Sequence, residues 1–396
     1  MKFTKRFFYL FFTYIFLILI FSCSSEDAPA EPEKPADAAE CRRTVLVYIV
    51  ANNNLGATGY DAKDIREMIL GAKNGNLPSD TRWLVYHAPY GNRTCRLFEI
   101  TATDTTTLKE YSAGLSATYA RMTEVFDDMA RLAPAAAYGL VLWSHGSGWI
   151  VNGIDEELPQ DSYGLKSFGN DDGQRMNVAT LRAAIKGREI DYVYFDVCYM
   201  GGVEVAYEMR DATELIVACP AEMPSDGMPY DINMAALSDG SRDAIVTAAA
   251  NTFEYYSSLP HEVNRTCTMS VIDTSALDRL AEATAYIYDL TPLPHPSDLV
   301  TDYSAGNLAV NAIDFGEYVN ALCEESKISP ELSEEFNAAL ESAVIYKAAT
   351  PKLWGVYPIY TASGLSTYFF TSTEAFKARN YNTLQWARDV AARHLH

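Results

Sequence analysis

The segment YVYFDVCYMGG, residues 192–202, says more about the architecture of this chain than any other. Its first half is a run of aromatic and β-branched residues, typical of a buried strand, and it ends at a cysteine followed closely by two glycines. The earlier segment YGLVLWSHGSGW, residues 138–149, has the same form but ends its apolar run at a histidine. Because ligands of open parallel sheets bind just beyond the carboxyl ends of strands, both segments predict strand ends that form a site.

Short apolar runs of this kind recur through the first half of the chain and are expected to be buried strands. They cover residues 44–50, 82–88, 138–144, 192–198 and 215–219. Apolar residues at helical spacing lie between them at 112–132 and 177–186, and a hairpin strand is expected at 93–101. Such alternation favours an α/β fold with a mostly parallel sheet flanked by helices.

Beyond residue 225 the pattern becomes mainly helical. Helices are expected at 242–257, 275–290, 315–325 and 330–346, and strand-like runs interrupt them at 268–272, 355–360 and 365–370. We therefore expect residues 44–225 to form an α/β core and residues 226–396 to form a helix-rich C-terminal extension packed on it. The alternative is that the second half forms a separate domain.

The N-terminus has the form of an export signal. Lys2, Lys5 and Arg6 precede an apolar run at residues 7–21, in the order of a secretory signal peptide, and the run is short for a membrane span. It ends before Cys23 in a pattern similar to a bacterial lipobox. We expect residues 1–22 to be a signal peptide. Cys23 would then carry a lipid anchor in the bacterial outer membrane, on the periplasmic or the cell-surface face.

The composition fits a folded exported protein. Of its 396 residues 48% are hydrophobic, enough for a substantial core, whereas residues 24–40 are mainly Ala, Pro, Ser and acids that cannot pack. We expect residues 23–43, which include the lipidated cysteine, to be a flexible tether. The formal net charge of −21 argues against nucleic acid as a partner, because that affinity depends on clustered Lys and Arg.

The cysteines do not follow the spacing of a zinc site or a disulfide scaffold. Apart from Cys23, the six others are scattered and form no CxxC pair, so no metal ligand set is expected. Cys219 closes an apolar run and is expected to be a small buried hydrophobe.

Cys198 and His145 are the candidates for chemistry. Taken singly, each is more often structural, because a cysteine closing an apolar strand usually packs and a histidine there usually forms turn hydrogen bonds. A thiol is mostly protonated at neutral pH, so a nucleophilic cysteine needs a base nearby, which His145 could be. Their places at the ends of consecutive strands, each followed by glycine, favour a catalytic pair. A helix beginning near Gly202 would favour the thiolate.

The chain resembles the clostripain family of cysteine peptidases, which belongs to the caspase-like structural group. The likeness lies in residues 44–48 with 52–55, 143–149, 195–200 with Glu204, 222 with 226–230, and 364–369. The His-to-Cys spacing of roughly 50 residues also suits a caspase-like layout. The resemblance implies an endopeptidase acting on protein or peptide substrates through a Cys198/His145 dyad and an acyl-enzyme. Backbone N–H groups of Gly146 and Cys198 would form the oxyanion hole.

Asp196 is the candidate for substrate recognition. It lies two residues before Cys198 and, because side chains alternate along a strand, on the same side. It matches the acid with which the family binds a basic P1 side chain, so cleavage after Arg or Lys is expected. The alternative is that Asp196 only braces the site.

The resemblance also suggests self-cleavage in the loop between His145 and Cys198. Lys166 is the best candidate there, ahead of Arg175. Some family members respond to calcium, so calcium could bind here although no cofactor is required. Loop acids without regular ligand spacing are Asp155, Glu156, Glu157, Asp161, Asp171 and Asp172.

Two other functions fit the sequence less well than peptidase activity. A surface-binding lipoprotein could keep a peptidase fold without activity, although such a protein would be expected to lose His145 or Cys198, and both are present. A flavodoxin-like or nucleotide-binding protein is disfavoured, because residues 51–54, after the first expected strand, contain no glycine-rich phosphate motif.

Overall fold

The computed structural model describes residues 41–91, 94–149, 168–291, 300–305, 312–368 and 381–391. The chain divides into the units Met1–Ala38 and Ala39–His396, and every described element lies in the second. The expected signal peptide, Cys23 and Lys166 lie outside the described residues. Within the described ranges, no helix combines the length and the apolar character needed to cross a bilayer.

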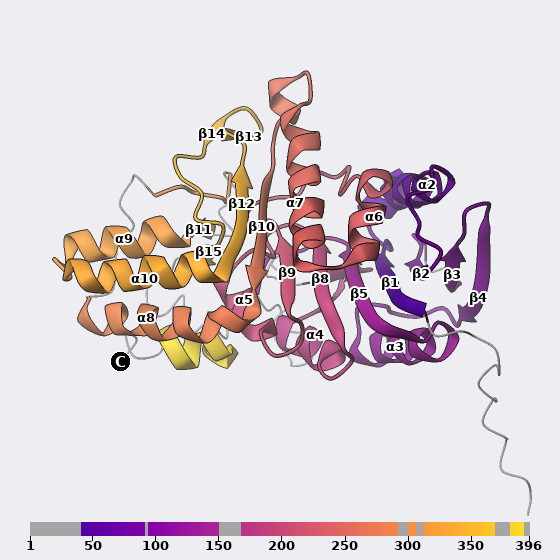
Figure 1. Ribbon diagram of the computed structural model, residues 1–396, viewed down its shortest axis with the longest axis horizontal. Coiled ribbons are helices and arrows are strands. Elements are labelled where there is room, and N and C mark those ends of the chain that lie inside the picture. The colour runs from indigo at the N-terminus through magenta and orange to yellow at the C-terminus, as the bar shows by residue number, and fades with distance from the viewer. Residues whose placement is uncertain are drawn as a thin grey trace, which may run out of the picture. The chain divides into compact units, whose positions relative to one another are not determined.

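A nine-stranded sheet forms the centre of the second unit, in the order β12-β10-β9-β8-β5-β1-β2-β3-β4 (Figure 1). Parallel pairing joins β1 (Cys41–Val50), β2 (Thr81–Ala88), β5 (Ala135–Trp143), β8 (Ile190–Asp196) and β9 (Leu215–Ala218). These strands coincide closely with the five apolar runs of the sequence. Antiparallel strands complete both sides: β3 (Cys95–Ile100), β4 (Thr105–Tyr111), β10 (Thr268–Asp273) and β12 (Val344–Ala349). The α/β fold class is confirmed, with a mixed sheet.

Helices cover both faces of the sheet because the central strands are apolar on both sides. Leu46 and Tyr48 of β1 pack in one core with α3 (Tyr119–Leu132), α4 (Val178–Ile185) and α5 (Val203–Met209). Val45 and Val47 point the other way and pack with helices on the opposite face of the sheet. These are α2 (Tyr60–Lys73), α6 (Tyr230–Asp239) and α7 (Arg242–Ser257).

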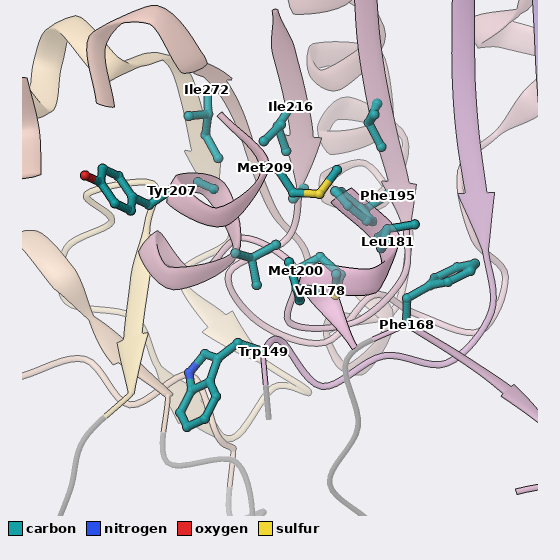
Figure 2. Packing of buried hydrophobic residues seen from close by; sticks show 14 of the residues in the cluster. Trp149, Phe168, Val178, Leu181, Phe195, Met200, Tyr207, Met209, Ile216 and Ile272 are labelled. Atoms are coloured by element: carbon teal, nitrogen blue, oxygen red, sulfur yellow. The ribbon is translucent and has the colours of Figure 1, made fainter. Parts of the chain in front are cut away.

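Figure 2 shows part of the first of these cores, around β8 and β9. Phe195 of β8 and Ile216 of β9 pack in it with Leu181 of α4 and Met209 of α5. Trp149, in the loop that follows β5, belongs to the same cluster. The loop after β5 is therefore anchored in the core that supports the ends of β5 and β8.

Two helices begin at capping residues that are visible in the sequence. Asn177 precedes α4 and its side chain accepts a 2.8 Å hydrogen bond from Thr180 N. Asp314 precedes α9 (Phe315–Glu325) and accepts a 2.9 Å hydrogen bond from Glu317 N. Such caps satisfy backbone donors that have no partner within the helix.

The C-terminal half adds helices and also strands of the main sheet. In Figure 1, α8 (Leu277–Leu290), α9 and α10 (Pro330–Ala343) gather beside β12, at the sheet edge opposite β4. β10 and β12 continue the sheet beyond β9, so the sheet crosses the boundary expected at residue 226. The helix expected over 330–346 ends at Ala343, because the chain from Val344 pairs with β10 instead.

Shorter elements complete the described fold. Helix α1 (Asn54–Thr58) follows β1 in the first half. Two small two-stranded sheets pair β11 (Ala312–Asp314) with the distant β15 (Ser366–Tyr368) and β13 (Lys352–Leu353) with the adjacent β14 (Tyr357–Pro358). A third pairs β6 (Phe168–Asp171) with β7 (Gln174–Met176). Short helical turns occur at Glu262–Asn264, Thr274–Ala276, Tyr381–Thr383 and Ala387–Ala391.

Candidate active site

The carboxyl ends of β5 and β8 bring His145 and Cys198 to one pocket. The two strands are parallel neighbours, and Trp143 at the end of β5 stands opposite Asp196 at the end of β8. His145 and Cys198 each follow two residues later, so both emerge at the same edge of the sheet. A pocket of about 190 Å³ is lined by both of them and by Asp196. The structure thus assembles the three side chains that the sequence singled out.

His145 is held by a neighbouring amide. Its Nε2 lies 2.7 Å from Oδ1 of Asn54, the first residue of α1. An amide oxygen only accepts, so Nε2 donates and the neutral ring keeps its lone pair on Nδ1. Burial, and then the charge of Arg175, lower the pKa of His145. The imidazole is therefore neutral at neutral pH and able to accept a proton.

The surroundings of Cys198 favour the protonated thiol. The side chain is half-buried, and its S–H group donates to the carbonyl oxygen of Met223 at 3.5 Å. Burial raises the pKa of Cys198 to about 12, and the nearby charges of Glu222 and Asp196 act in the same direction. A neutral thiol beside a neutral imidazole can attack a carbonyl only if the proton moves to the ring.

The backbone around Cys198 forms a sharp turn. Tyr199 has φ 61°, a conformation uncommon for a residue with a side chain, and its N–H donates to Ala221 O at 2.9 Å. Gly148 has φ 74°, and a Cβ atom there would lie 3.1 Å from Tyr199 O. Glycine at 148 therefore lets the loop after His145 approach the loop after Cys198 closely.

The expected oxyanion residues lie on these two loops. Gly146 directly follows His145, and its backbone forms an isolated antiparallel bridge with Phe168. The carbonyl of His145 accepts a 3.0 Å hydrogen bond from Gly169 N. This bond ties the loop after β5 to strand β6. Cys198 itself lines the pocket. The two backbone segments whose N–H groups would bind an oxyanion are thus held in place.

Asp196 lines the pocket and is also tied to the protein. Its side chain is buried, with Oδ1 accepting from Met228 N at 3.1 Å and Oδ2 accepting from Tyr230 Oη at 2.9 Å. Burial raises the pKa of Asp196, while these two hydrogen bonds oppose the rise. The carboxyl group therefore braces the segment of Met228 and Tyr230, and Asp196 also forms part of the pocket wall.

Two residues of the site were missed in the sequence. Asn54 lies after the first strand, in a stretch that carries the family resemblance, and the rule about strand ends could have pointed to it. Trp354 comes from the β13–β14 hairpin, lines the pocket, and donates its indole N–H to Glu222 Oε2 at 3.0 Å. No local pattern marks Trp354, because only the tertiary fold brings it to the pocket.

Segments from the C-terminal part of the chain brace the loops of the site. The Trp149 ring packs edge-on against the rings of Tyr368 and Tyr381, with centroids 5.1 and 4.7 Å away. Glu204 of α5 is buried and accepts hydrogen bonds from Thr367 Oγ1 at 2.8 Å and Tyr368 N at 3.0 Å. The loop after His145 and the helix after Cys198 thus share the same support.

The loop acids that could bind calcium fall largely outside the described residues. Among those described, Asp171 accepts from Asn52 Nδ2 at 3.0 Å and from Ser116 N, so its oxygens serve a structural contact. No group of three or more His, Cys, Asp or Glu side chains in the described ranges is placed to hold a metal ion. The six described cysteines, including buried Cys219, are free thiols.

Comparison with known proteins identifies the family of the chain. The clostripain family model matches residues 47–387. An inactive zymogen C11 protease from Parabacteroides distasonis is 29% identical, with a TM-score of 0.75 over 89% of this chain and 99% of that one. A secreted C11 cysteine protease from Bacteroides thetaiotaomicron, in complex with an irreversible peptide inhibitor, is 25% identical, with a TM-score of 0.71 over 87% and 98%.

A further structure shares the fold. A secreted C11 cysteine protease from Bacteroides thetaiotaomicron is 22% identical, with a TM-score of 0.74 over 89% of this chain and 100% of that one. No curated protein matches the chain. The match to the family model covers most of the chain. The α/β fold and the thiol in the pocket are consistent with a cysteine peptidase. The protein therefore belongs to the clostripain family of cysteine peptidases.

Proposed function

We propose that the protein is an endopeptidase that cleaves after Arg or Lys, with Cys198 as nucleophile and His145 as its proton-transfer partner. The observation that carries the proposal is a single pocket lined by a thiol, an imidazole and a buried carboxyl group, those of Cys198, His145 and Asp196. His145 is held by Asn54 after β1, whereas Cys198 and Asp196 are both held by the loop that contains Met223 and Met228.

The proton states of the pair support a definite order of steps. The thiol proton of Cys198 moves to Nδ1 of His145 as sulfur attacks the scissile carbonyl carbon. Backbone N–H groups of Gly146 and Cys198 stabilise the oxyanion that forms. The imidazolium then protonates the leaving amine, which leaves a thioester on Cys198. Water attacks the thioester while His145 accepts its proton, and the free thiol returns.

Asp196 supplies the preference for a basic P1 residue. Asp196 lines the pocket and lies two residues before Cys198, which supports a place for it beside the side chain of the residue before the scissile bond. A cationic side chain there forms charge-assisted hydrogen bonds and offsets the cost of a buried carboxylate. A neutral side chain leaves that carboxylate with only the hydrogen bonds from Met228 N and Tyr230 Oη and with no cation.

The remaining parts of the proposal concern export and activation. The N-terminal segment supports a signal peptide over residues 1–22 and a lipid anchor on Cys23 in the outer membrane, and a related structure is described as a secreted protease. Another relative is described as an inactive zymogen, which supports activation by self-cleavage, with Lys166 as the site. No cofactor is required for the chemistry, and calcium would act through the loop acids.

Fluorogenic peptides that differ only at P1 test the proposed function. Wild type is expected to cleave Arg and Lys peptides, Cys198→Ala to lose all cleavage, and Asp196→Asn to lose about 10-fold or more on basic P1 while changing little on neutral P1. An Arg-chloromethylketone should label Cys198 selectively. Full activity in Cys198→Ala would overturn the proposal. No labelling and no cleavage by the Lys166-processed protein would favour a binding lipoprotein instead.

A further inference from the structure

Arg175 of β7 is a half-buried cation without a carboxylate partner. Its Nε is buried and donates no hydrogen bond among the described residues. Burial lowers the pKa of Arg175 to about 10, and no carboxylate charge opposes the fall. Asp and Glu outnumber Lys and Arg by 52 to 31 in this chain, so a partly buried cation left without a carboxylate is unusual.

The β6–β7 hairpin that carries Arg175 is attached to the ends of β5 and β1. Gly169 N donates a 3.0 Å hydrogen bond to the carbonyl of His145, which follows β5. Asp172 N donates a 2.9 Å hydrogen bond to the carbonyl of Asn52, which follows β1. These bonds fix the hairpin on the His145 side of the site.

Arg175 projects from the face of this hairpin that is turned away from the core. Phe168 and Met176 are paired across the hairpin, and both are buried in the core that contains α3, α4 and α5. Because side chains alternate along a strand, Arg175 lies on the other face. It is half-buried rather than enclosed, so a ligand can reach the guanidinium.

The charge of Arg175 acts on the imidazole of the pair. After burial, it is the charge that lowers the pKa of His145. The side-chain charges that raise the pKa of Cys198 are instead those of Glu222 and Asp196. Arg175 is therefore a neighbour of the imidazole rather than of the thiol.

The order of the strands assigns this side of the site to the leaving peptide. In the sequence β9-β8-β5-β1 across the sheet, Cys198 follows β8 and His145 follows β5. In the proposed mechanism His145 protonates the leaving amine, so the leaving peptide passes on the β5 side of Cys198. The loop after β9, with Glu222 and Met223, lies on the other side. The β6–β7 hairpin thus borders the path of the residues after the scissile bond.

We propose that Arg175 binds an acidic side chain of the substrate on the leaving side of the scissile bond, at P1′ or P2′. This inference rests on the proposed function and deepens it. A guanidinium can bind a carboxylate through two parallel hydrogen bonds, which gives Arg175 the partner that it lacks. Preferred substrates then combine Arg or Lys before the scissile bond with Asp or Glu shortly after it.

Internally quenched peptides test this inference in the full chain. They carry Arg at P1, differ only by Glu or Gln at P1′ or P2′, and end several residues later in an amide, so that only the side chain supplies a carboxylate. Wild type is expected to show a kcat/KM about 10-fold higher for Glu than for Gln at one of these positions. Arg175→Gln should remove the difference by slowing cleavage of the Glu peptide. Equal rates in wild type at both positions would overturn the inference.

Reversing the charge separates a direct contact from support of the hairpin. Arg175→Glu should prefer Lys over Gln at the position where wild type prefers Glu. A residue that only held His145 or the hairpin would change all the peptides equally when it is replaced. Equal losses in Arg175→Gln, or no reversal in Arg175→Glu, would therefore contradict the inference.

Arg188→Gln is the matched control. Arg188 lies two residues before β8, at the opposite edge of the sheet, and pairs with Asp127 at 2.7 Å. The substitution removes the same charge as Arg175→Gln does, far from the site, and should leave the preference for Glu unchanged. If it weakens the preference as much, the net charge of the protein explains both results and the inference fails.

Binding gives a readout that does not depend on cleavage. In the Cys198→Ala protein, fluorescence anisotropy should give a Kd about 10-fold lower for the Glu peptide than for the Gln peptide, and adding Arg175→Gln should equalise them. Equal Kd values in the first protein would count against the Arg175 contact. Cysteine-dependent cleavage after Arg without any preference for Glu would overturn this inference and leave the proposed function standing. Binding through Arg175 without any cleavage by wild type would instead overturn the proposed function.

Discussion

The hydrogen bond between Asn54 and His145 makes Asn54 a positioning residue. Asn54→Ala removes the acceptor for Nε2, so the ring can rotate and present either nitrogen to Cys198. We expect kcat to fall on the order of 10²-fold, as for a displaced catalytic group, with KM nearly unchanged. Steady-state kinetics on one peptide measures both values. A raised KM with unchanged kcat would show that Asn54 binds substrate instead.

The pH profile gives a second measure of the same contact. Because burial lowers the pKa of His145, the fall of kcat/KM on acidification should begin below the ordinary range of histidine. Asn54→Asp places a carboxylate at Nε2, which stabilises the protonated ring, so the acid limb should move to higher pH. This variant also restores the acceptor, and it should recover activity lost in Asn54→Ala. An unmoved acid limb in Asn54→Asp would mean that another group controls it.

Among the elements, the β13–β14 hairpin controls one wall of the pocket. Trp354 has φ 54° and is held by its hydrogen bond to Glu222, and neighbouring Val356 is 69% exposed. Trp354→Ala should raise KM about 5-fold, since losing an aromatic contact costs on the order of 1 kcal/mol. Val356→Ala, on the same hairpin, should leave KM unchanged. Equal effects of the two variants would indicate a change in the hairpin rather than in the pocket.

Helix α2 shows why one residue near the site could not be predicted from the sequence. The central strands were predictable, because runs such as residues 44–50 are apolar on both faces. The buried face of α2 instead carries Asp61, Asp64, Met68, Gly71 and Ala72. Two acids and a glycine on that face hide the helical spacing of apolar residues. Asp64, one of those acids, accepts a hydrogen bond from Trp143, which lines the pocket, so the apolar pattern of this helix is broken next to the site.

Strand β12 illustrates a different limit of sequence patterns. Residues 344–346 extend the apolar pattern of the preceding helix, so a helix through residue 346 was expected. Pairing with β10 overrides that local preference and ends α10 at Ala343. Such long-range pairing leaves no mark in the residues themselves. The joining of β10 and β12 to the main sheet was unpredictable for the same reason.

For the molecule as a whole, the continuous sheet predicts cooperative unfolding. β9 pairs with β8 on one side and with β10 on the other, so residues before and after position 226 share one hydrogen-bonded sheet. We expect one calorimetric transition for residues 41–396. A fragment ending at residue 225 would leave the edge of β9 unpaired and expose the core beneath α6 and α7, so it should aggregate or unfold without a cooperative transition. Two separate transitions in the long chain, or a fragment that unfolds cooperatively, would instead assign the C-terminal half to an independent domain.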